Sequence, residues 1–207
     1  MENDRKFTQQ ADEYSANYEK MLKLMGLFVM MWEPRQRKKF LQGLDIAKGS
    51  KILDICTGPG NNLKELHKQI GKEGLLVAID LSEKMVEKCQ KKHATLPVSI
   101  HRGNALALPY KDNFFDVVIT SGGLNTFGDK KKGITEMMRV GKKGALIVIV
   151  DEGMKPTKRE TWIGKRLIKM NSLYKTKPPL KLLPDEVDPK IGYIYRDTFY
   201  TLQFENP

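Results

Sequence analysis

Cysteine and histidine are scarce in this sequence, and their scarcity argues against a disulfide-stabilised protein and against a zinc-binding one. Cys56 and Cys89 are the only cysteines among 207 residues, and only three histidines accompany them. So few ligands, so irregularly spaced, build neither a disulfide framework nor a zinc cluster. The first ten residues, MENDRKFTQQ, also lack the apolar core of a signal peptide. We therefore expect no metal site and expect the protein to work in a reducing cytoplasm.

Long apolar runs are missing as well. The longest, Met21 to Trp32 (MLKLMGLFVMMW), is shorter than the roughly 20 residues that a membrane-spanning helix needs. A buried helix, or one that covers an active site, is the favoured interpretation, and its methionines would form an adaptable apolar wall around a greasy substrate. The alternative is a membrane-surface helix, in which the basic residues of 21–39 meet lipid phosphates.

Negative charge is in short supply. Lysine and arginine number 36 against 25 aspartates and glutamates, which gives a formal charge of +11 and a pI near 9.5. Such an excess favours an anionic partner, whether nucleic acid, anionic lipid or a charged metabolite. The lysines are scattered along the expected helices, however, so we interpret them as solvated helix faces. No repeat or low-complexity tract interrupts the chain, and its length suits one domain.

The most informative stretch is Lys51 to Asn62, KILDICTGPGNN. Its apolar start predicts a short buried strand, Gly58 and Gly60 predict a turn, and Asn61 opens a helical pattern. A strand, a glycine turn and a helix N-terminus together present backbone N–H groups to an anionic or carboxylate-bearing ligand. The next apolar strand ends at Asp80, about 20 residues after the turn, where a nucleotide-binding unit places an acid against ribose hydroxyls. The ligand is therefore predicted to carry a ribose.

Strands and helices alternate downstream of this turn. We predict strands near 51–56, 75–80, 98–101, 115–121 and 145–151, and helices near 61–71, 82–93 and 130–140. This alternation indicates an α/β protein with a mostly parallel sheet, helices on both faces and ligands at the carboxyl ends of the strands. A helix over Thr157 to Leu173 and a proline-rich loop over 175–189 should follow. The chain would end in two antiparallel strands, 191–195 and 199–204.

Three motifs resemble class I S-adenosylmethionine-dependent methyltransferases. Asp54 to Gly60 is similar to their acid-x-Gly-x-Gly-x-Gly motif, with Cys56 at the first glycine. Arg102 to Thr120 is similar to the Gly-Asp-Ala...Leu-Pro-Phe...Phe-Asp-Val stretch of the ubiquinone and menaquinone C-methyltransferase group, and Glu136 to Gly144 to its Arg-Val-Leu-Lys-Pro-Gly-Gly turn. The resemblance covers residues 48–151. It implies a Rossmann-like, doubly wound, seven-stranded sheet in the order 3-2-1-4-5-7-6 with a terminal antiparallel hairpin.

The resemblance also implies how a single methyltransferase domain over 1–207 would be divided. Residues 1–47 would form an N-terminal helical lid and 48–151 the cofactor-binding core. Residues 152–190 form either a substrate cap or a plain connection, and 191–207 the terminal β-hairpin. Within the lid, Tyr14 and Tyr18 lie four residues apart on one face of an expected helix, where they contact substrate or simply pack.

Carried over residue by residue, the resemblance assigns S-adenosylmethionine as the cofactor and gives roles to the strand ends. Asp54 would orient the glycine turn, and Asp80 would accept hydrogen bonds from the ribose hydroxyls. The family usually has aspartate where Asn104 stands, and an amide can both donate and accept, so the adenine contact through this side chain would be altered but not excluded. The other implied contacts are Thr57, Gly58, Gly60 and Asn61 for the methionine part, Leu81, Met85 and Ala105 for the adenine, and Thr120 and Ser121 near the sulfonium.

The acceptor side departs from the family pattern. The ubiquinone and menaquinone enzymes typically carry Phe-Gly-Leu-Arg-Asn after the fourth strand, where this chain has Gly122-Gly-Leu-Asn-Thr126. Asn125 thus replaces the arginine and becomes a candidate substrate contact, and a quinone substrate is not assigned. No catalytic residue is assigned either, because in-line methyl transfer depends mainly on orientation and a base is optional.

The predicted function is methyl transfer from S-adenosylmethionine to a small-molecule acceptor, apolar or aromatic. One alternative is a methyltransferase for RNA or protein, which the positive charge would suit although no Asn-Pro-Pro-Tyr type motif follows the fourth strand. A second is a protein that binds S-adenosylmethionine without catalysis. A third is a nicotinamide-dependent oxidoreductase, which would need a fuller Gly-x-Gly-x-x-Gly turn and would leave the terminal hairpin unexplained.

Overall fold

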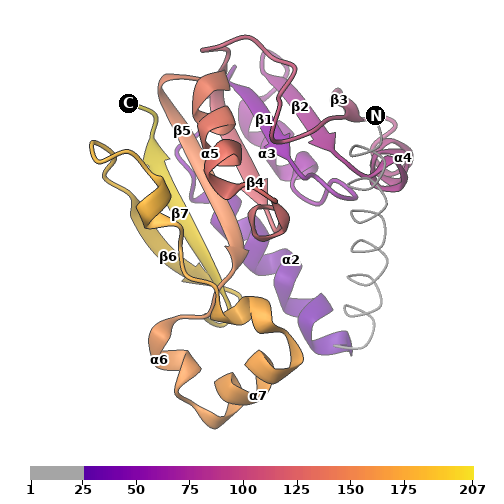
Figure 1. Cartoon of the computed structure of the whole chain (residues 1–207). Coiled ribbons are helices and arrows are strands. Elements are labelled where there is room, and N and C mark those ends of the chain that lie inside the picture. The colour runs from indigo at the N-terminus through magenta and orange to yellow at the C-terminus, as the bar shows by residue number, and fades with distance from the viewer. Residues whose placement is uncertain (1–25) are drawn as a thin grey trace, which may run out of the picture.

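The computed structural model describes residues 26–207, with side chains from Pro34 onward. Seven strands form one sheet in the order β3-β2-β1-β4-β5-β7-β6 (Figure 1), so the predicted fold and strand order are confirmed. The strands are β1 (Lys51–Ile55), β2 (Leu75–Asp80), β3 (Ser99–Arg102), β4 (Phe115–Ser121), β5 (Gly141–Glu152), β6 (Lys190–Ile194) and β7 (Phe199–Glu205). The pairs among β1 to β5 are parallel, whereas β7 runs antiparallel to both β5 and β6.

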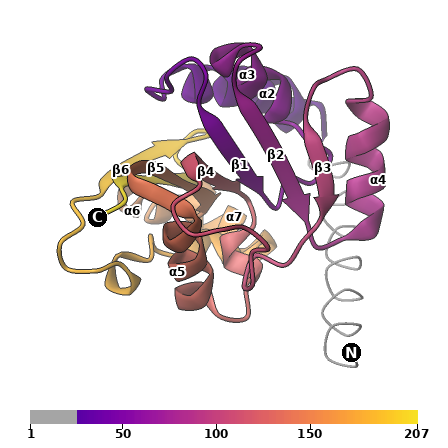
Figure 2. The same cartoon turned by 90° about the horizontal axis from the view of Figure 1, so that it is seen from above.

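Helices cover both faces of this sheet, as Figure 2 shows. Side chains alternate along each strand, so Ile52 of β1 faces one way while Leu53 and Ile55 face the other. The first face packs against α2 (Gly26–Gln42), α3 (Leu63–Ile70) and α4 (Glu83–Lys92). The second packs against α5 (Lys130–Val140). With both faces covered, the strands read as continuous apolar runs, which is the pattern from which they were predicted.

Most predicted elements end within two residues of those observed, but two differ. The helix expected over Thr157 to Leu173 is divided into α6 (Pro156–Arg159) and α7 (Trp162–Met170). Thr161 ends the continuity, because it is extended and its hydroxyl accepts a hydrogen bond from the backbone N–H of Gly164 at 3.0 Å, which caps α7. β5 begins at Gly141 instead of 145. Short turns complete the chain: η1 (Leu124–Thr126), η2 (Ser172–Lys175) and η3 (Leu180–Leu182).

The terminal hairpin is antiparallel, as predicted, and its turn is built from three successive left-handed residues. Tyr195, Arg196 and Asp197 have φ values of 52°, 57° and 64°. The backbone N–H of Tyr195 donates to the side-chain oxygen of Gln36 in α2 at 2.7 Å, across 159 residues of sequence. This bond joins the hairpin to α2, which also lies against α3.

Candidate functional site

The carboxyl ends of β1, β2, β3 and β4 lie side by side at one edge of the sheet. Parallel register makes them neighbours, since Ile55 pairs with Ile79 and Asp80 with Arg102. Twelve of the predicted cofactor residues lie on these strand ends or the segments that follow them: Asp54, Thr57, Gly58, Gly60, Asn61, Asp80, Leu81, Met85, Asn104, Ala105, Thr120 and Ser121. Asn125 joins them from η1. Tyr14 and Tyr18 lie outside the described residues.

The turn after β1 is tied directly to Asp80 at the end of β2. The backbone N–H of Gly58 donates to Oδ2 of Asp80 at 2.8 Å, and the backbone N–H of Ser82 donates to Oδ1 at 3.0 Å. Asp80 therefore holds the glycine turn and the start of α4 together at this edge of the sheet.

The two glycines of the turn serve different needs. Both have positive φ, 53° at Gly58 and 75° at Gly60. A Cβ on Gly58 would meet no atom within 4 Å, whereas a Cβ on Gly60 would lie 2.6 Å from the sulfur of Cys89 and 2.7 Å from the ring of His93. Gly58 thus leaves an open surface for a ligand, and Gly60 admits close packing of α4.

Cys56 stands where the methyltransferase motif usually has its first glycine, and its backbone adopts the left-handed conformation that glycine favours. Its φ is 56°, a region that costs a side-chain-bearing residue about 1–2 kcal/mol. Its side chain is accommodated by Gly123, where a Cβ would lie 2.6 Å from Cβ of Cys56. Desolvation, with the nearby carboxylates of Asp80 and Asp151, raises the pKa of the Cys56 thiol well above its usual range. The group therefore stays a neutral thiol and is a poor nucleophile.

A buried network behind the turn was not anticipated from the sequence. Asp54 is fully buried, and its carboxylate accepts hydrogen bonds from the hydroxyl of Thr57 at 2.7 Å and the amide of Asn62 at 3.2 Å. The amide oxygen of Asn62 accepts a bond from Arg37 of α2 at 3.3 Å. Burial raises the pKa of Asp54 to about 6, although these hydrogen bonds oppose the shift. Thr57 therefore serves the turn, and its side chain points at Asp54.

The remaining residues on this side have mixed environments. Met85 is buried, as is Ala105, while Leu81 is half-buried. Oδ1 of Asn104 accepts a local bond from the backbone N–H of Leu106 at 2.9 Å, which shapes the loop after β3. Oδ1 of Asn61 accepts a bond from Nζ of Lys92 at the end of α4 at 2.6 Å.

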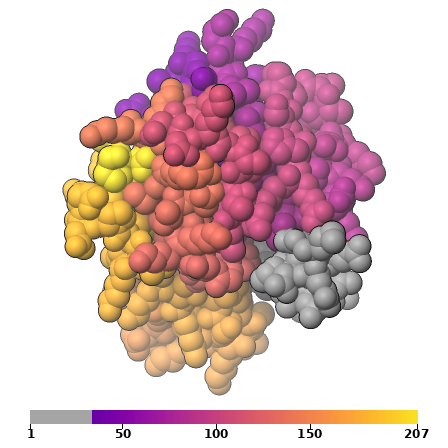
Figure 3. Space-filling model, turned by 45° about the horizontal axis from the view of Figure 1, so that its top comes forward, coloured from indigo at the N-terminus to yellow at the C-terminus, as the bar shows by residue number. Residues whose placement is uncertain are grey.

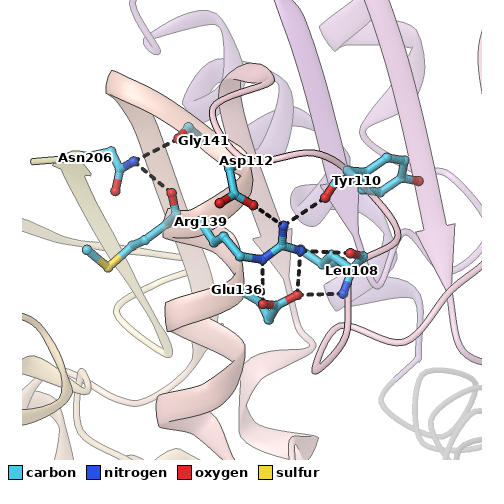
Figure 4. Close-up of polar contacts among 8 residues, drawn as sticks. Leu108, Tyr110, Asp112, Glu136, Arg139, Gly141 and Asn206 are labelled. Carbon is cyan, nitrogen blue, oxygen red and sulfur yellow. Dashed lines mark hydrogen bonds and ion pairs between the residues drawn. The ribbon is translucent and has the colours of Figure 1, made fainter.

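Arg139 clamps the loop that follows Asn104, and Figure 4 shows how. All five N–H groups of its guanidinium are used: two donate to Glu136, one to Asp112, and one each to the carbonyls of Leu108 and Tyr110, at 2.7–2.8 Å. Glu136 also accepts the backbone N–H of Leu108 at 2.7 Å. The Arg139 guanidinium holds the pKa of Glu136 below its usual range. Two motifs that carried the family resemblance therefore join each other.

Nearby, the chain end is fastened in the same manner. The amide of Asn206 donates to the carbonyls of Met138, Gly141 and Lys142 at 2.8–3.1 Å, around the junction of α5 and β5. Figure 4 draws the bond to Gly141.

A second polar cluster lies at the ends of β4 and β5. The amide nitrogen of Asn125 donates to Oδ1 of Asp151 at 3.0 Å and to the carbonyl of Glu152 at 2.8 Å, and its backbone N–H donates to Oδ2 of Asp151 at 2.7 Å. Nζ of Lys130 donates to the amide oxygen of Asn125 at 2.9 Å. Both amide hydrogens of Asn125 are therefore occupied, and the side chain positions Lys130.

The carboxyls of this cluster are deeply buried. Asp151 is fully buried and Glu152 nearly so. Burial, with the neighbouring carboxyl of Glu152, raises the pKa of Asp151 well above its usual range. The hydroxyls of Thr120 and Tyr200 and Oε2 of Glu152 are buried and lack hydrogen-bond partners among the described residues. The raised pKa of Asp151 weakens the negative charge that this carboxyl can set against Lys130.

Histidines and metals contribute little to this edge. His101, at the end of β3, contacts the hydroxyl of Tyr110 through Nε2. Desolvation lowers the pKa of His93, which packs against Gly60. Across residues 26–207, no three histidine, cysteine or acidic side chains are grouped as metal ligands would be.

Comparison with known proteins agrees with this geometry. The model of the ubiE/COQ5 methyltransferase family matches residues 2–161. A demethylmenaquinone methyltransferase of Desulfitobacterium hafniense is 36% identical over 125 residues, covering 58% of this chain and 49% of that protein. One of Shouchella clausii is 32% identical over 143 residues, covering 68% and 61%. The chain thus spans about half to three-fifths of the length of these curated relatives.

Solved structures share the fold. A SAM-dependent methyltransferase from Aquifex aeolicus superimposes with a TM-score of 0.63 and 20% identity, over 85% of this chain and 90% of that one. Geranyl diphosphate C-methyltransferase from Streptomyces coelicolor, solved with S-adenosyl-L-homocysteine, gives a TM-score of 0.66 and 15% identity, over 84% and 81%. The sheet order with its antiparallel hairpin and the family match together overturn the nicotinamide-dependent alternative. This chain belongs to the ubiE/COQ5 methyltransferase family, whose fold is that of the S-adenosylmethionine-dependent methyltransferases.

Proposed function

We propose that this protein transfers a methyl group from S-adenosylmethionine to a small aromatic acceptor that carries an ionisable hydroxyl, of the demethylmenaquinone class. The observation that carries the cofactor assignment is the Asp80 carboxylate bound to the Gly58 amide at 2.8 Å, on an edge with open space beside Gly58. The acceptor class is supported by the demethylmenaquinone methyltransferases among the relatives.

The described residues fit such a cofactor. The Asp80 carboxylate, a hydrogen-bond acceptor, would contact the ribose hydroxyls, and the left-handed Gly58 would let the amino-acid part approach the main chain. Thr57 and Asp54 would act from behind by fixing the turn, with Gly60 admitting α4. The loop held by Arg139 would place Asn104 and Ala105 beside the adenine, with Leu81 and Met85 on its other side.

Bound S-adenosylmethionine supplies an electrophilic methyl group on its sulfonium. Transfer forms a bond from the methyl carbon to the acceptor and breaks the carbon–sulfur bond, leaving S-adenosylhomocysteine, while the acceptor loses one proton. Thr120 and Ser121 at the end of β4 would border the reacting centre. The protein mainly orients the acceptor, and orientation of this kind supplies about 7–11 kcal/mol.

Lys130 is the residue that we assign to the acceptor oxygen. The relatives' motif has arginine at position 125, and here Asn125 holds the ammonium of Lys130 with its amide oxygen at 2.9 Å. The ammonium has two more N–H donors. A cation there favours the ionised form of a phenolic hydroxyl, which raises the electron density of the ring and so its nucleophilicity. Asn125 is a positioning residue in this scheme.

Other features of the chain are consistent with this assignment. We place the reaction in a reducing cytoplasm, in line with the free thiols of Cys56 and Cys89. Residues 1–47, 48–151 and 191–207 would serve as lid, cofactor core and closing hairpin of one domain, and 152–190 as a cap near the acceptor. Membrane contact through 21–39 is not part of the proposal. Neither is RNA or protein methylation, which no contact on this edge favours.

Two measurements test the proposal. Isothermal titration with S-adenosylhomocysteine should give micromolar binding, and NADH should give none. The protein should then convert a short-chain demethylmenaquinone, reduced to its hydroquinone, into a product heavier by one CH₂ with S-adenosylhomocysteine formed in equal amount. Binding of NADH alone would remove the cofactor assignment. Cofactor binding without methylation of the hydroquinone would remove the acceptor class.

A further inference from the structure

The positive charge of this protein is concentrated beyond the end of β5. Residues 155–182, here called the α6–α7 lobe, hold nine basic residues and one acidic residue, Glu160. That segment therefore carries a formal charge of +8, against +11 for the whole chain. The lysines of the core helices are scattered, whereas the basic residues of this segment are close together in the sequence. Figure 1 shows the lobe extending past the carboxyl ends of β4 and β5, the edge that holds the candidate site.

Large apolar side chains are exposed on the same lobe. Trp162 is 72% exposed, Met170 61% and Ile163 43%, and all three belong to α7. Trp162, Arg166 and Met170 follow one another at intervals of four residues, so they lie on the same side of the helix. Ile163 lies on the adjoining side. Such residues are normally buried in folded proteins, and clustered exposure marks an interaction surface.

The opposite side of α7 faces α6. Gly164 is buried, and a Cβ there would lie 2.0 Å from the carbonyl oxygen of Lys158 in α6. Arg159 fastens the lobe by donating to the carbonyls of Met154 at 2.7 Å and Thr176 at 2.9 Å. Because the lobe is fastened in this way, Trp162 and Met170 of α7 face outward. Lys165, Arg166 and Lys169 are exposed beside them. In Figure 3 the lobe forms a projection at the lower end of the molecule.

We propose that the α6–α7 lobe docks on an anionic lipid bilayer, with Trp162, Ile163 and Met170 entering the headgroup region and the basic residues binding lipid phosphates. A short helix that combines exposed tryptophan and aliphatic side chains with lysine and arginine fits a membrane interface. Charge complementarity selects anionic lipid as the occupant. A nucleic acid would use the cations but gives no reason for exposed isoleucine and methionine. No helix within residues 26–207 is long and apolar enough to span the bilayer.

The docked lobe would place the candidate site at the membrane. β5 ends at Glu152, three residues before the lobe begins. An acceptor with a lipid-soluble tail could then pass from the bilayer to the strand ends without crossing water. Docking itself does not depend on the proposed methyl transfer, because binding can be measured without cofactor or acceptor. The matched family region ends at residue 161, so α7 lies outside the family comparison.

Sedimentation with vesicles tests this proposal on the whole chain. Vesicles of phosphatidylcholine with one-third phosphatidylglycerol should retain the protein, and vesicles of phosphatidylcholine alone should not. Each basic residue near an anionic surface strengthens binding roughly fivefold, so the triple variant K165Q/R166Q/K169Q should bind about 100-fold more weakly. W162A/M170A should bind about tenfold more weakly. In a Trp32→Phe background, Trp162 fluorescence should shift to the blue on binding.

Matched controls come from elsewhere on the surface. K68Q/K84Q/K91Q removes the same charge from α3 and α4, and Ile191→Ala removes an apolar side chain that is 44% exposed on β6. Both should bind vesicles like the unmodified protein. Equal binding by W162A/M170A, equal weakening by the control triple, or preference for poly(U) over the vesicles would overturn the proposal. S-adenosylhomocysteine titration of each variant checks folding, and its failure in the unmodified protein would count against the proposed function alone.

Discussion

Replacement of Asp80 by alanine provides the sharpest test of the cofactor site. The carboxylate accepts two backbone N–H groups, from Gly58 at 2.8 Å and Ser82 at 3.0 Å. In the proposed complex this carboxylate also accepts hydrogen bonds from the two ribose hydroxyls. A hydrogen bond to a charged group contributes about 1.5–3 kcal/mol, so the loss of two costs about 3–6 kcal/mol. Asp80→Ala should therefore weaken S-adenosylhomocysteine binding by about 100-fold or more, measured by isothermal titration.

Asp116 supplies the matched control at the opposite edge of the sheet. Its carboxylate also accepts two bonds, from the backbone N–H of Lys51 at 2.8 Å and from Nζ of Lys142 at 2.6 Å. Asp116→Ala should lower the free energy of unfolding by on the order of 1–3 kcal/mol, about as much as Asp80→Ala, and should keep full cofactor affinity. Asp80→Asn retains one acceptor oxygen and should fall between the two. Binding by folded Asp80→Ala within threefold of the unmodified protein would refute the assignment.

Three further predictions concern other parts of the site. Lys130→Met should lower kcat by roughly 10- to 100-fold and shift the pH profile of kcat upward, with the affinity for S-adenosylhomocysteine unchanged. Lys130→Arg should recover part of the rate. An unchanged pH profile in Lys130→Met would contradict the proposed role of Lys130. The pKa of Asp54 is raised to about 6 from 3.8, so its contribution to stability is fully present below pH 3.8 and is lost as the pH rises to about 6. The free energy of unfolding should fall by about 3 kcal/mol over this range. The difference in free energy of unfolding between Asp54→Asn and the unmodified protein, measured by urea unfolding, should therefore change over pH 4–6, and a difference that does not depend on pH would contradict the prediction. Arg139→Ala should lower the free energy of unfolding by about 2–4 kcal/mol and weaken cofactor binding. Arg139→Lys should restore little of either, since lysine has three N–H donors where arginine serves five acceptor contacts. Full restoration by lysine would show that the positive charge alone matters.

The sheet was predictable from sequence because each strand carries a local signal. Lys51–Ile55 and Leu75–Asp80 are apolar runs that end at turn residues, and buried parallel strands read in that way. The strand order followed from the family resemblance. Thr161 is a residue type that favours N-caps over helix interiors, so the division between α6 and α7 had a signal in the sequence that the prediction did not use; its extended backbone shows the cap.

The environment of Asn125 could not be read from the sequence. Its partner Asp151 lies 26 residues away, and the two meet because the parallel register sets Ser121 of β4 beside Val150 of β5. Register places both strand ends at one edge, but it does not tell which side-chain atoms bond. The Arg139 clamp is similar, since it joins two motifs 27 to 31 residues apart. The charge of the α6–α7 lobe, in contrast, could have been found by counting basic residues segment by segment.

The charges around the candidate site follow the electrostatics of the proposed reaction. In the proposed reaction Asp80 would contact the cofactor, and Lys130, held through Asn125, would face the acceptor. A sulfonium cation and a phenolate anion neutralise each other as the methyl group moves, so a poorly hydrated site favours the transition state over the separated ions. Burial and the neighbouring Glu152 raise the pKa of Asp151, which weakens the negative charge that it can set against Lys130. Asp151→Asn should therefore preserve much of the activity, whereas Asp151→Leu, which cannot hold Asn125, should reduce it as Lys130→Met does.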